Sequence, residues 1–222
     1  RFITRTVNPL GQASSASYDI KWGKPTLTTG VDGLTTRYQY DAFGRLIKTT
    51  LPTGSVINEN YGFNLSSSYG STYYHQTSQI GQPTRWVYYD KLDRKIRHHR
   101  KGHQNKTIYQ IWTFDSRGRL KTERDPYKSG ESTFTTTYYY DTYNRPTREV
   151  NPFGTTSYSY SYASGKTKLT KTDPAGQVST IELDASGLKT KTTDSGGTLN
   201  FTYNSQGNVT EVKLGNTVLV SN

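Results

Sequence analysis

The chain has 222 residues, a formal net charge of +11, no cysteine and only 31% hydrophobic residues, with a mean hydropathy of −0.84. The lack of cysteine excludes a disulfide framework, a thiolate metal site and a cysteine nucleophile, and the lack of a long apolar run argues against membrane insertion. The 19 tyrosines and abundant threonine supply β-propensity and buryable area that hydropathy counts as polar. The composition therefore favours an all-β fold.

The chain is predicted to begin inside a repeated hairpin. Residues 2–11 match residues 145–154 position by position, and residues 20–25 predict a short strand and a turn. The first complete hairpin is expected next, at residues 33–54, and it serves as the reference for the rest of the chain.

The reference hairpin is centred on the sequence YQYDAFGRL. Tyr38 and Tyr40 alternate with a polar residue, so both rings are expected on one face of a strand. Asp41 can accept a hydrogen bond from the backbone two residues later, and Gly44 tolerates positive φ. The pattern Asp-x-x-Gly predicts a type I turn closed by a glycine bulge, and Arg45 begins the return strand.

The same pattern recurs at spacings of roughly 20 to 26 residues, apart from one double gap. The first turn position holds Asp41, Asp90, Asp115, Asp141, Ala163, Asp184 and Asn204. Three residues later, Gly44, Asp93, Gly118, Asn144, Gly187 and Gly207 suit a left-handed backbone, and Lys166 is the exception. The residues predicted to carry the repeat are Tyr38, Tyr40, Asp41, Gly44, Arg45, Tyr89, Asp90, Arg94, Trp112, Phe114, Asp115, Gly118, Arg119, Tyr138, Tyr140, Asp141, Arg145, Leu183, Asp184, Gly187, Phe201, Tyr203 and Gly207.

Two parts of the chain depart from the pattern. The serine-rich stretch at residues 58–83 predicts a degenerate copy or a longer surface loop, and residues 155–222 become less aromatic and richer in Gly, Thr and Lys. No linker interrupts the repeats. We therefore expect a single continuous array over residues 1–222, taken from a longer chain because both ends fall within repeats.

These residues resemble the YD repeats of the RHS family, whose pattern is aromatic-x-Tyr-Asp-x-x-Gly-Arg-Leu followed by Pro-x-Gly. The best copies are RYQYDAFGRL, WTFDSRGRLKTERDP and YYYDTYNRPTREVNPFG. The resemblance implies repetitive antiparallel β-hairpins joined side by side into a curved, spiralling sheet, which is a portion of the wall of a hollow shell. In bacterial RHS/Tc-type toxins such a shell encloses a cytotoxic C-terminal segment, and the related teneurins use a similar shell for cell-surface adhesion.

The resemblance also implies a structural role without enzymatic activity, cofactor or metal. The expected location is outside the producing bacterium, by secretion or delivery, with the cell surface as the alternative. The expected partners are the remainder of the parent shell and its encapsulated C-terminal toxin or cargo. An isolated run of hairpins leaves two open sheet edges, so edge-to-edge self-association is expected as well.

Two other binding functions stay open. Carbohydrate binding in an adhesion module is one, because aromatic rings stack on sugars and repetition amplifies weak sites, although core packing explains the same rings. Nucleic-acid binding is the other: the segment from Lys91 to Lys106 holds seven Lys and Arg residues, and aromatic residues flank it. The simpler interpretation of this segment is that its charges blunt strand edges.

The candidates for metal binding and catalysis are weak. His98 and His99 are adjacent and should point to opposite faces of a strand, and no second cluster completes a site with them or with His103. His75 has serines nearby but no Gly-x-Ser-x-Gly elbow. The dipeptide Asp125-Pro126 and the sequence DPAG at residues 173–176 resemble fragments of the self-cleavage motif of RHS toxins, but both are predicted to be turns.

Four aspartates are expected to pair with an arginine across their turns, each pair contributing about 0–1 kcal/mol if exposed. These pairs are Asp41–Arg45, Asp90–Arg94, Asp115–Arg119 and Asp141–Arg145.

Overall fold

The computed structural model describes residues 2–63 and 70–221, and over these residues the chain is all-β, with 20 strands in one antiparallel sheet and a single 3-10 turn, η1 (His103–Asn105). The expected fold class is confirmed. The strands are β1 (Arg5–Val7), β2 (Ala13–Asp19), β3 (Lys24–Thr29), β4 (Thr35–Tyr40), β5 (Leu46–Thr50), β6 (Val56–Phe63), β7 (Tyr73–Gln79), β8 (Arg85–Tyr89), β9 (Lys95–Lys101), β10 (Thr107–Phe114), β11 (Leu120–Lys128), β12 (Thr135–Tyr140), β13 (Pro146–Asn151), β14 (Gly154–Ala163), β15 (Lys166–Thr172), β16 (Val178–Leu183), β17 (Lys189–Asp194), β18 (Gly197–Tyr203), β19 (Val209–Leu214) and β20 (Thr217–Ser221).

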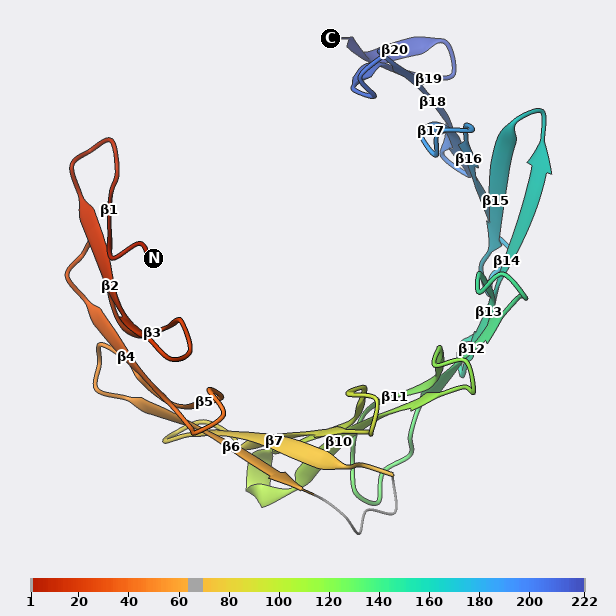
Figure 1. The fold of residues 1–222 in the computed structure, drawn as a ribbon. Coiled ribbons are helices and arrows are strands. Elements are labelled where there is room, and N and C mark those ends of the chain that lie inside the picture. The colour runs from red at the N-terminus through yellow and green to blue at the C-terminus, as the bar shows by residue number, and fades with distance from the viewer. Residues whose placement is uncertain (1, 64–69, 222) are drawn as a thin grey trace. The chain divides into compact units, whose positions relative to one another are not determined.

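The chain divides into two compact units, one made of residues 1–112 with 126–133 and the other of residues 113–125 with 134–222. Within the first unit, each strand from β1 to β10 pairs with the next in chain order, and the same holds from β11 to β20 in the second (Figure 1). Turns that follow even-numbered strands therefore share one edge of each unit. We call this edge the motif edge, because it carries the turns at residues 41–44, 90–93, 115–118, 141–144, 184–187 and 204–207.

The motif turns have the predicted geometry. The N–H of Gly44 donates to the carbonyl of Asp41 at 3.0 Å, the N–H of Asp41 donates to the carbonyl of Arg45 at 2.9 Å, and Gly44 has φ of 75°. Asn144 and Asp93 take φ of 65° and 62° at the same position in their own turns, since Asn and Asp tolerate the left-handed region better than most residues. The prediction that a backbone requirement selects this column is confirmed.

The assignment of Ala163 and Lys166 to the repeat columns is wrong. Ala163 ends β14 and pairs directly with Lys166, the first residue of β15. The turn consists of Ser164 and Gly165 with φ of 51° and 73°. Positive φ at both central residues is the mark of a two-residue type I′ turn. This turn is shorter than the Asp-x-x-Gly turn, so aligning it with the motif turns placed residues 163 and 166 in the wrong columns.

The prediction for Asp125-Pro126 is also wrong, because both residues lie within β11. The register with β12 ends at Arg124 opposite Thr135, so Pro126 falls beyond the ladder with β12, where its missing N–H costs no hydrogen bond to that strand. The prediction for residues 173–176 is right: the N–H of Gly176 donates to the carbonyl of Asp173 at 3.0 Å.

Within residues 58–83, the structure supports a degenerate copy rather than a long loop for the parts that it describes. β6 and β7 pair from Ile57 opposite Gln79 to Phe63 opposite Tyr73. Most of the serine-rich stretch, at residues 64–69, lies outside the described residues. The described part of the segment is therefore a pair of antiparallel strands whose sequence lacks the motif.

Side chains in both units pack across neighbouring strands of a single layer. No large side chain among the described residues is fully buried, and Ile96 is the one buried hydrophobic residue, at 7% exposure. Thr49 and Asp90 are also buried. Contacts between adjacent hairpins therefore carry more of the stabilisation than a central core does. Of the part of the chain that the structure describes, no helix is long and apolar enough to cross a membrane.

Candidate functional site

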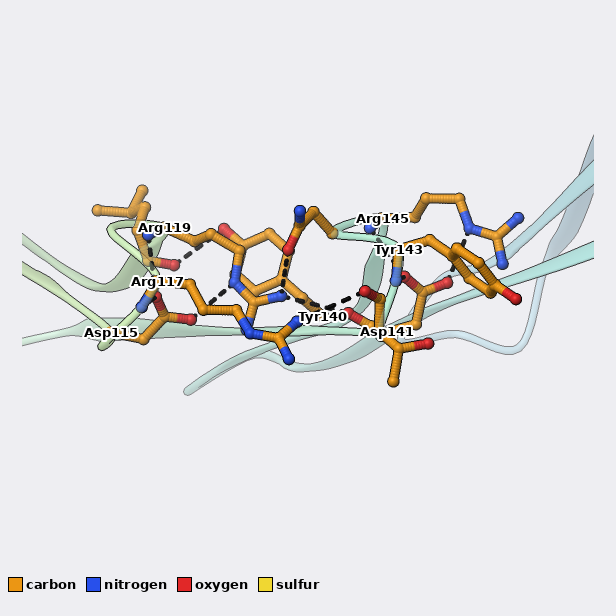
Figure 2. Close-up of polar contacts among 10 residues, drawn as sticks. Asp115, Arg117, Arg119, Tyr140, Asp141, Tyr143 and Arg145 are labelled. Atoms are coloured by element: carbon orange, nitrogen blue, oxygen red, sulfur yellow. Dashed lines mark hydrogen bonds and ion pairs between the residues drawn. The ribbon is translucent and has the colours of Figure 1, made fainter.

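One aspartate organises each of the best motif turns. In the turn at residues 141–144, Oδ1 of Asp141 accepts hydrogen bonds from the N–H groups of Tyr143 at 2.8 Å and Arg145 at 2.9 Å, and Oδ2 accepts from Nε of Arg145 at 2.7 Å (Figure 2). The carboxylate thus binds the turn backbone with one oxygen and the guanidinium with the other. The same arrangement recurs in the pairs Asp41–Arg45, Asp90–Arg94 and Asp115–Arg119.

These hydrogen bonds keep the aspartates ionised. Burial by itself raises the pKa of the Asp141 carboxyl, but the hydrogen bonds from Arg145 and Tyr143 outweigh it, so the pKa lies below its ordinary value of 3.8. The pKa values of the Asp41, Asp90 and Asp115 carboxyls are lowered by the same balance of causes. All four carry a full negative charge at neutral pH, and the expected ion pairs are confirmed.

The arginine of one hairpin also contacts the next hairpin. The guanidinium of Arg119 lies 4.6 Å from the ring centroid of Tyr140, and its Nη1 donates to the carbonyl of Asp141 at 3.2 Å and to Oδ1 of Asn144 at 3.0 Å (Figure 2). Arg119 therefore joins its own turn, at Asp115, to the following motif turn.

Two further copies show the same stacking. The guanidinium of Arg145 lies 4.2 Å from the ring centroid of Tyr160, and that of Arg45 lies 4.8 Å from that of Tyr61. A cation over an aromatic ring contributes about 0.5–1 kcal/mol at an exposed site. The contact occurs in both units, with one of these three pairs in the first and two in the second.

The tyrosine that precedes the first turn residue makes a hydrogen bond to the preceding hairpin, whereas the arginine contacts the following one. The hydroxyl of Tyr140 donates to the carbonyl of Leu120 at 2.9 Å, and those of Tyr40 and Tyr203 donate to the carbonyls of Pro25 at 2.8 Å and Lys189 at 2.7 Å. Each acceptor lies on an odd-numbered strand that precedes the tyrosine. We call the combination of turn aspartate, arginine and tyrosine hydroxyl the brace.

The arginine of the brace is missing from the last two copies. Asp184 and Asn204 bind the N–H groups two and four residues later through Oδ1, as the other copies do. Leu188 and Asn208 stand where the arginine would be, so no guanidinium extends from these turns. Gly187 and Gly207 still take positive φ. The backbone requirement therefore persists where the side-chain contacts have been lost.

The other predicted repeat residues lie on the strands that lead into the motif turns or, for Gly118, in a turn itself. Tyr38 contacts Thr28 through hydroxyl groups 3.3 Å apart, and the ring of Tyr89 stacks on Tyr73 at 4.8 Å. Lys95 Nζ lies 4.0 Å from the Trp112 ring centroid. The remaining predicted positions are Phe114 at the end of β10, Gly118 in its turn, Tyr138 on β12, Leu183 at the end of β16 and Phe201 on β18.

Sequence reasoning missed one polar contact in the hairpin of β6 and β7. Nε2 of His75 lies 2.6 Å from Oε2 of Glu59, and the same oxygen accepts from Oγ1 of Thr77 at 2.7 Å. The ring of His75 also stacks on Tyr61 at 4.6 Å. The alternation of side chains within β6 and β7 was the signal that could have placed these residues on one face. Without the turn motif, the two strands were not recognised as a pair.

The remaining candidates do not form a recognisable reactive site. His98 and His99 lie on opposite faces of β9, as expected, and His103 lies in η1. Across residues 2–63 and 70–221, no group of three or more metal-binding side chains is close enough to hold an ion. The clearest repeated arrangement is the brace, whose hydrogen bonds, ion pair and ring stacking fix the turns and connect neighbouring hairpins.

Comparison with a family model identifies one repeat directly. Residues 18–56 match the RHS repeat model. The match contains YQYDAFGRL, with its turn aspartate, glycine and arginine, so the resemblance noted from the sequence is confirmed there. No curated protein matches the chain.

Solved structures share the fold along most of the chain. The crystal structure of TcdB2-TccC3 matches with a TM-score of 0.72 at 13% identity, over 96% of this chain and 15% of that one. The crystal structure of TcdB2-TccC3-Cdc42 gives 0.54 at 14% identity, over 94% and 13%. A Tc holotoxin pore structure from Photorhabdus luminescens gives 0.53 at 12% identity, over 91% and 14%. The chain thus spans 15% or less of each of these three structures.

Proposed function

Since residues 18–56 are an RHS repeat and the fold is shared with a segment of TcdB2-TccC3, we propose that this chain is a structural wall segment of a hollow β-shell that encloses a toxin or cargo domain. The parent would be a secreted bacterial RHS-type protein. The partners of the segment would be the remainder of the shell and the enclosed C-terminal cargo.

The observation that carries this proposal is the brace, because it recurs in both units and links consecutive hairpins. A hairpin by itself is marginally stable in water, and a single-layer sheet has few buried side chains to compensate. Arg119 and Tyr140 connect successive hairpins without needing a second layer. A wall that must enclose a volume needs this kind of lateral continuity, whereas a catalyst needs reactive groups free to engage a substrate.

A structural role also accounts for the ionised side chains at the motif edge. Asp41, Asp90, Asp115 and Asp141 are each occupied by backbone N–H groups and an arginine. A general acid or base needs a pKa near the working pH, and these carboxyls have pKa values lowered away from it. We therefore propose that the segment is not enzymatic. Glycan binding by the same rings gains no support, since their contacts are with neighbouring hairpins.

Limited proteolysis of the full gene product that contains this segment tests the proposal. We expect the region C-terminal to the repeats to resist a protease that cleaves it rapidly when it is produced alone. Combining Arg119→Ala with Tyr140→Phe removes contacts that tie the turn at residues 115–118 to the next hairpin, and should make the region accessible. Lys121→Ala, at an exposed position, should not. Rapid cleavage of that region in the unmodified protein would contradict enclosure.

A further inference from the structure

A patch of aromatic side chains lies on the face of the first unit opposite to the motif rings. Directly opposed residues of paired strands share a face, and the register places Trp86, His99 and Tyr109 in one such row. Tyr74, Tyr88 and Arg97 form the neighbouring row on the same face. We call these six residues of β7 to β10 the aromatic patch.

The rings of the patch contact one another from strand to strand. The His99 ring centroid lies 4.6 Å from that of Trp86, 5.3 Å from that of Tyr88 and 5.7 Å from that of Tyr109. The guanidinium of Arg97 lies 5.4 Å from the Tyr88 centroid and 4.8 Å from the Tyr109 centroid. The patch is therefore a preformed surface, with one cation placed between two rings.

A cleft of about 210 Å³ opens at one end of the patch. Arg97 and Tyr109 form one side of it, and the other side is formed by Tyr127, near the end of β11, with Ser129 and Gly130 just after that strand. The ring centroids of Tyr109 and Tyr127 are 5.8 Å apart. Rings and a guanidinium thus line a concave site of a size that suits one planar group.

The charged residues on the strands that carry the aromatic patch are all basic, whereas β11, which carries Tyr127, holds acids as well as bases. Among the described residues of β6 to β10, Glu59 is the only acid, and it lies on the opposite face, bound to His75 and Thr77. Lys101 shares the face of the patch with Arg97. Glu131, in the segment beside the cleft, is bound to Lys128 through both the backbone N–H and Nζ, each at 3.2 Å.

We propose that the aromatic patch and its cleft bind single-stranded nucleic acid, with a base on the rings of Tyr109 and Tyr127 and the phosphates near Arg97 and Lys101. Aromatic platforms beside a cationic track are the usual means of binding single strands without sequence preference. The charge favours a polyanion over a neutral glycan, which would make no use of it. The proposal is independent of the role in a shell wall.

Fluorescence anisotropy of a labelled 15-nucleotide oligo(dT) with the purified chain tests this proposal. We expect salt-dependent binding that Tyr127→Ser weakens about tenfold, as stacking losses do. Arg97→Gln should also weaken binding, and should reduce the slope of log K against log salt by about 1. Arg100→Gln is the matched control, because it removes the same charge from the other face of β9.

Each outcome decides the proposal. Binding that falls with Tyr127→Ser and Arg97→Gln but not with Arg100→Gln supports it, provided that circular dichroism shows the variants folded. Absence of binding at low salt overturns it. Equal losses for the two arginine variants, or binding unaffected by Tyr127→Ser, also overturn it, since they indicate general charge attraction. If Arg97→Gln does not fold, Tyr127→Ser decides alone, because Tyr127 lies beyond the part of β11 that pairs with β12.

Discussion

Substitution of Gly44 tests the geometry of the motif turn, because an added side chain would cause both backbone strain and a steric clash at this residue. Its φ of 75° lies in the left-handed region, where a residue with a Cβ is strained by about 1–2 kcal/mol. A Cβ at Gly44 would also lie 2.6 Å from Cδ2 and 2.7 Å from Cε3 of Trp22. Since overpacking costs about 1–3 kcal/mol, we expect Gly44→Ala to lower the free energy of unfolding by about 2–5 kcal/mol.

Gly54, at the other end of β5, provides the matched control. It closes a turn with the same hydrogen bonds and has φ of 80°, but an added Cβ would meet no heavy atom within 4 Å. Gly54→Ala should therefore cost only the backbone strain, about 1–2 kcal/mol. The difference between the two variants isolates the contact with Trp22.

Urea denaturation followed by circular dichroism measures both variants. In a Trp22→Ala background the ring is absent, so Gly44→Ala should then cost no more than Gly54→Ala. Equal destabilisation of the two glycine variants in the native background would refute the steric part of this reasoning. An unchanged stability of Gly44→Ala would refute the turn geometry itself.

The remaining predictions concern charge, the brace and the open edge. Burial, followed by the charges of Arg97, His98 and Lys101, lowers the pKa of the His99 ring from 6.5 to about 4. As the pH falls, the unfolded chain therefore takes up the proton before the folded chain does. The free energy of unfolding should be highest above pH 6.5 and fall by about 1–2 kcal/mol as the pH drops to 4, after allowance for solvent screening. His99→Phe should flatten this part of a pH series of urea midpoints. Arg119→Ala should cost about 1–2 kcal/mol in the same assay, from the lost stacking and hydrogen bonds, and a cost equal to that of the exposed Lys121→Ala would contradict the brace. Asp90→Asn should lower the free energy of unfolding by about 1–2 kcal/mol at pH 7. The difference between variant and unmodified chain should vanish below the lowered pKa of Asp90, where the carboxyl is protonated and uncharged. A difference independent of pH would exclude the ion pair as its cause. β20 exposes Val218 at 47%, so Val218→Lys should reduce edge-to-edge association measured by light scattering, and an isolated chain that is monomeric at high concentration would contradict that association.

The parts of this structure that sequence predicted are local. Asp41 and Gly44 are three residues apart, and the turn that they form depends on backbone geometry that no distant contact changes. The ion pair of Asp41 with Arg45 is equally local, because the turn itself brings the two side chains together. The alternation of Tyr38 and Tyr40 predicted their common face for the same reason.

The parts that sequence could not predict depend on which strands become neighbours and in which register. The contact of Arg119 with Tyr140 requires β11 and β12 to be paired, and the pattern within either strand carries no sign of it. Trp22 approaches Gly44 only because β3 and β4 place successive turns side by side. The turn at Ser164 and Gly165 was misplaced because a shorter hairpin loop shifts the repeat by one position. The Asp125-Pro126 pair was misjudged because only the ladder with β12 ends before the proline, while β11 itself continues to Lys128.

Cryo-electron microscopy of the full gene product tests the central claim most directly. The account predicts that this segment forms part of a continuous antiparallel wall, with braces linking its hairpins and with density for the enclosed C-terminal region on one side of it. A map in which these hairpins fold as an isolated domain, with no enclosed density, would contradict the account.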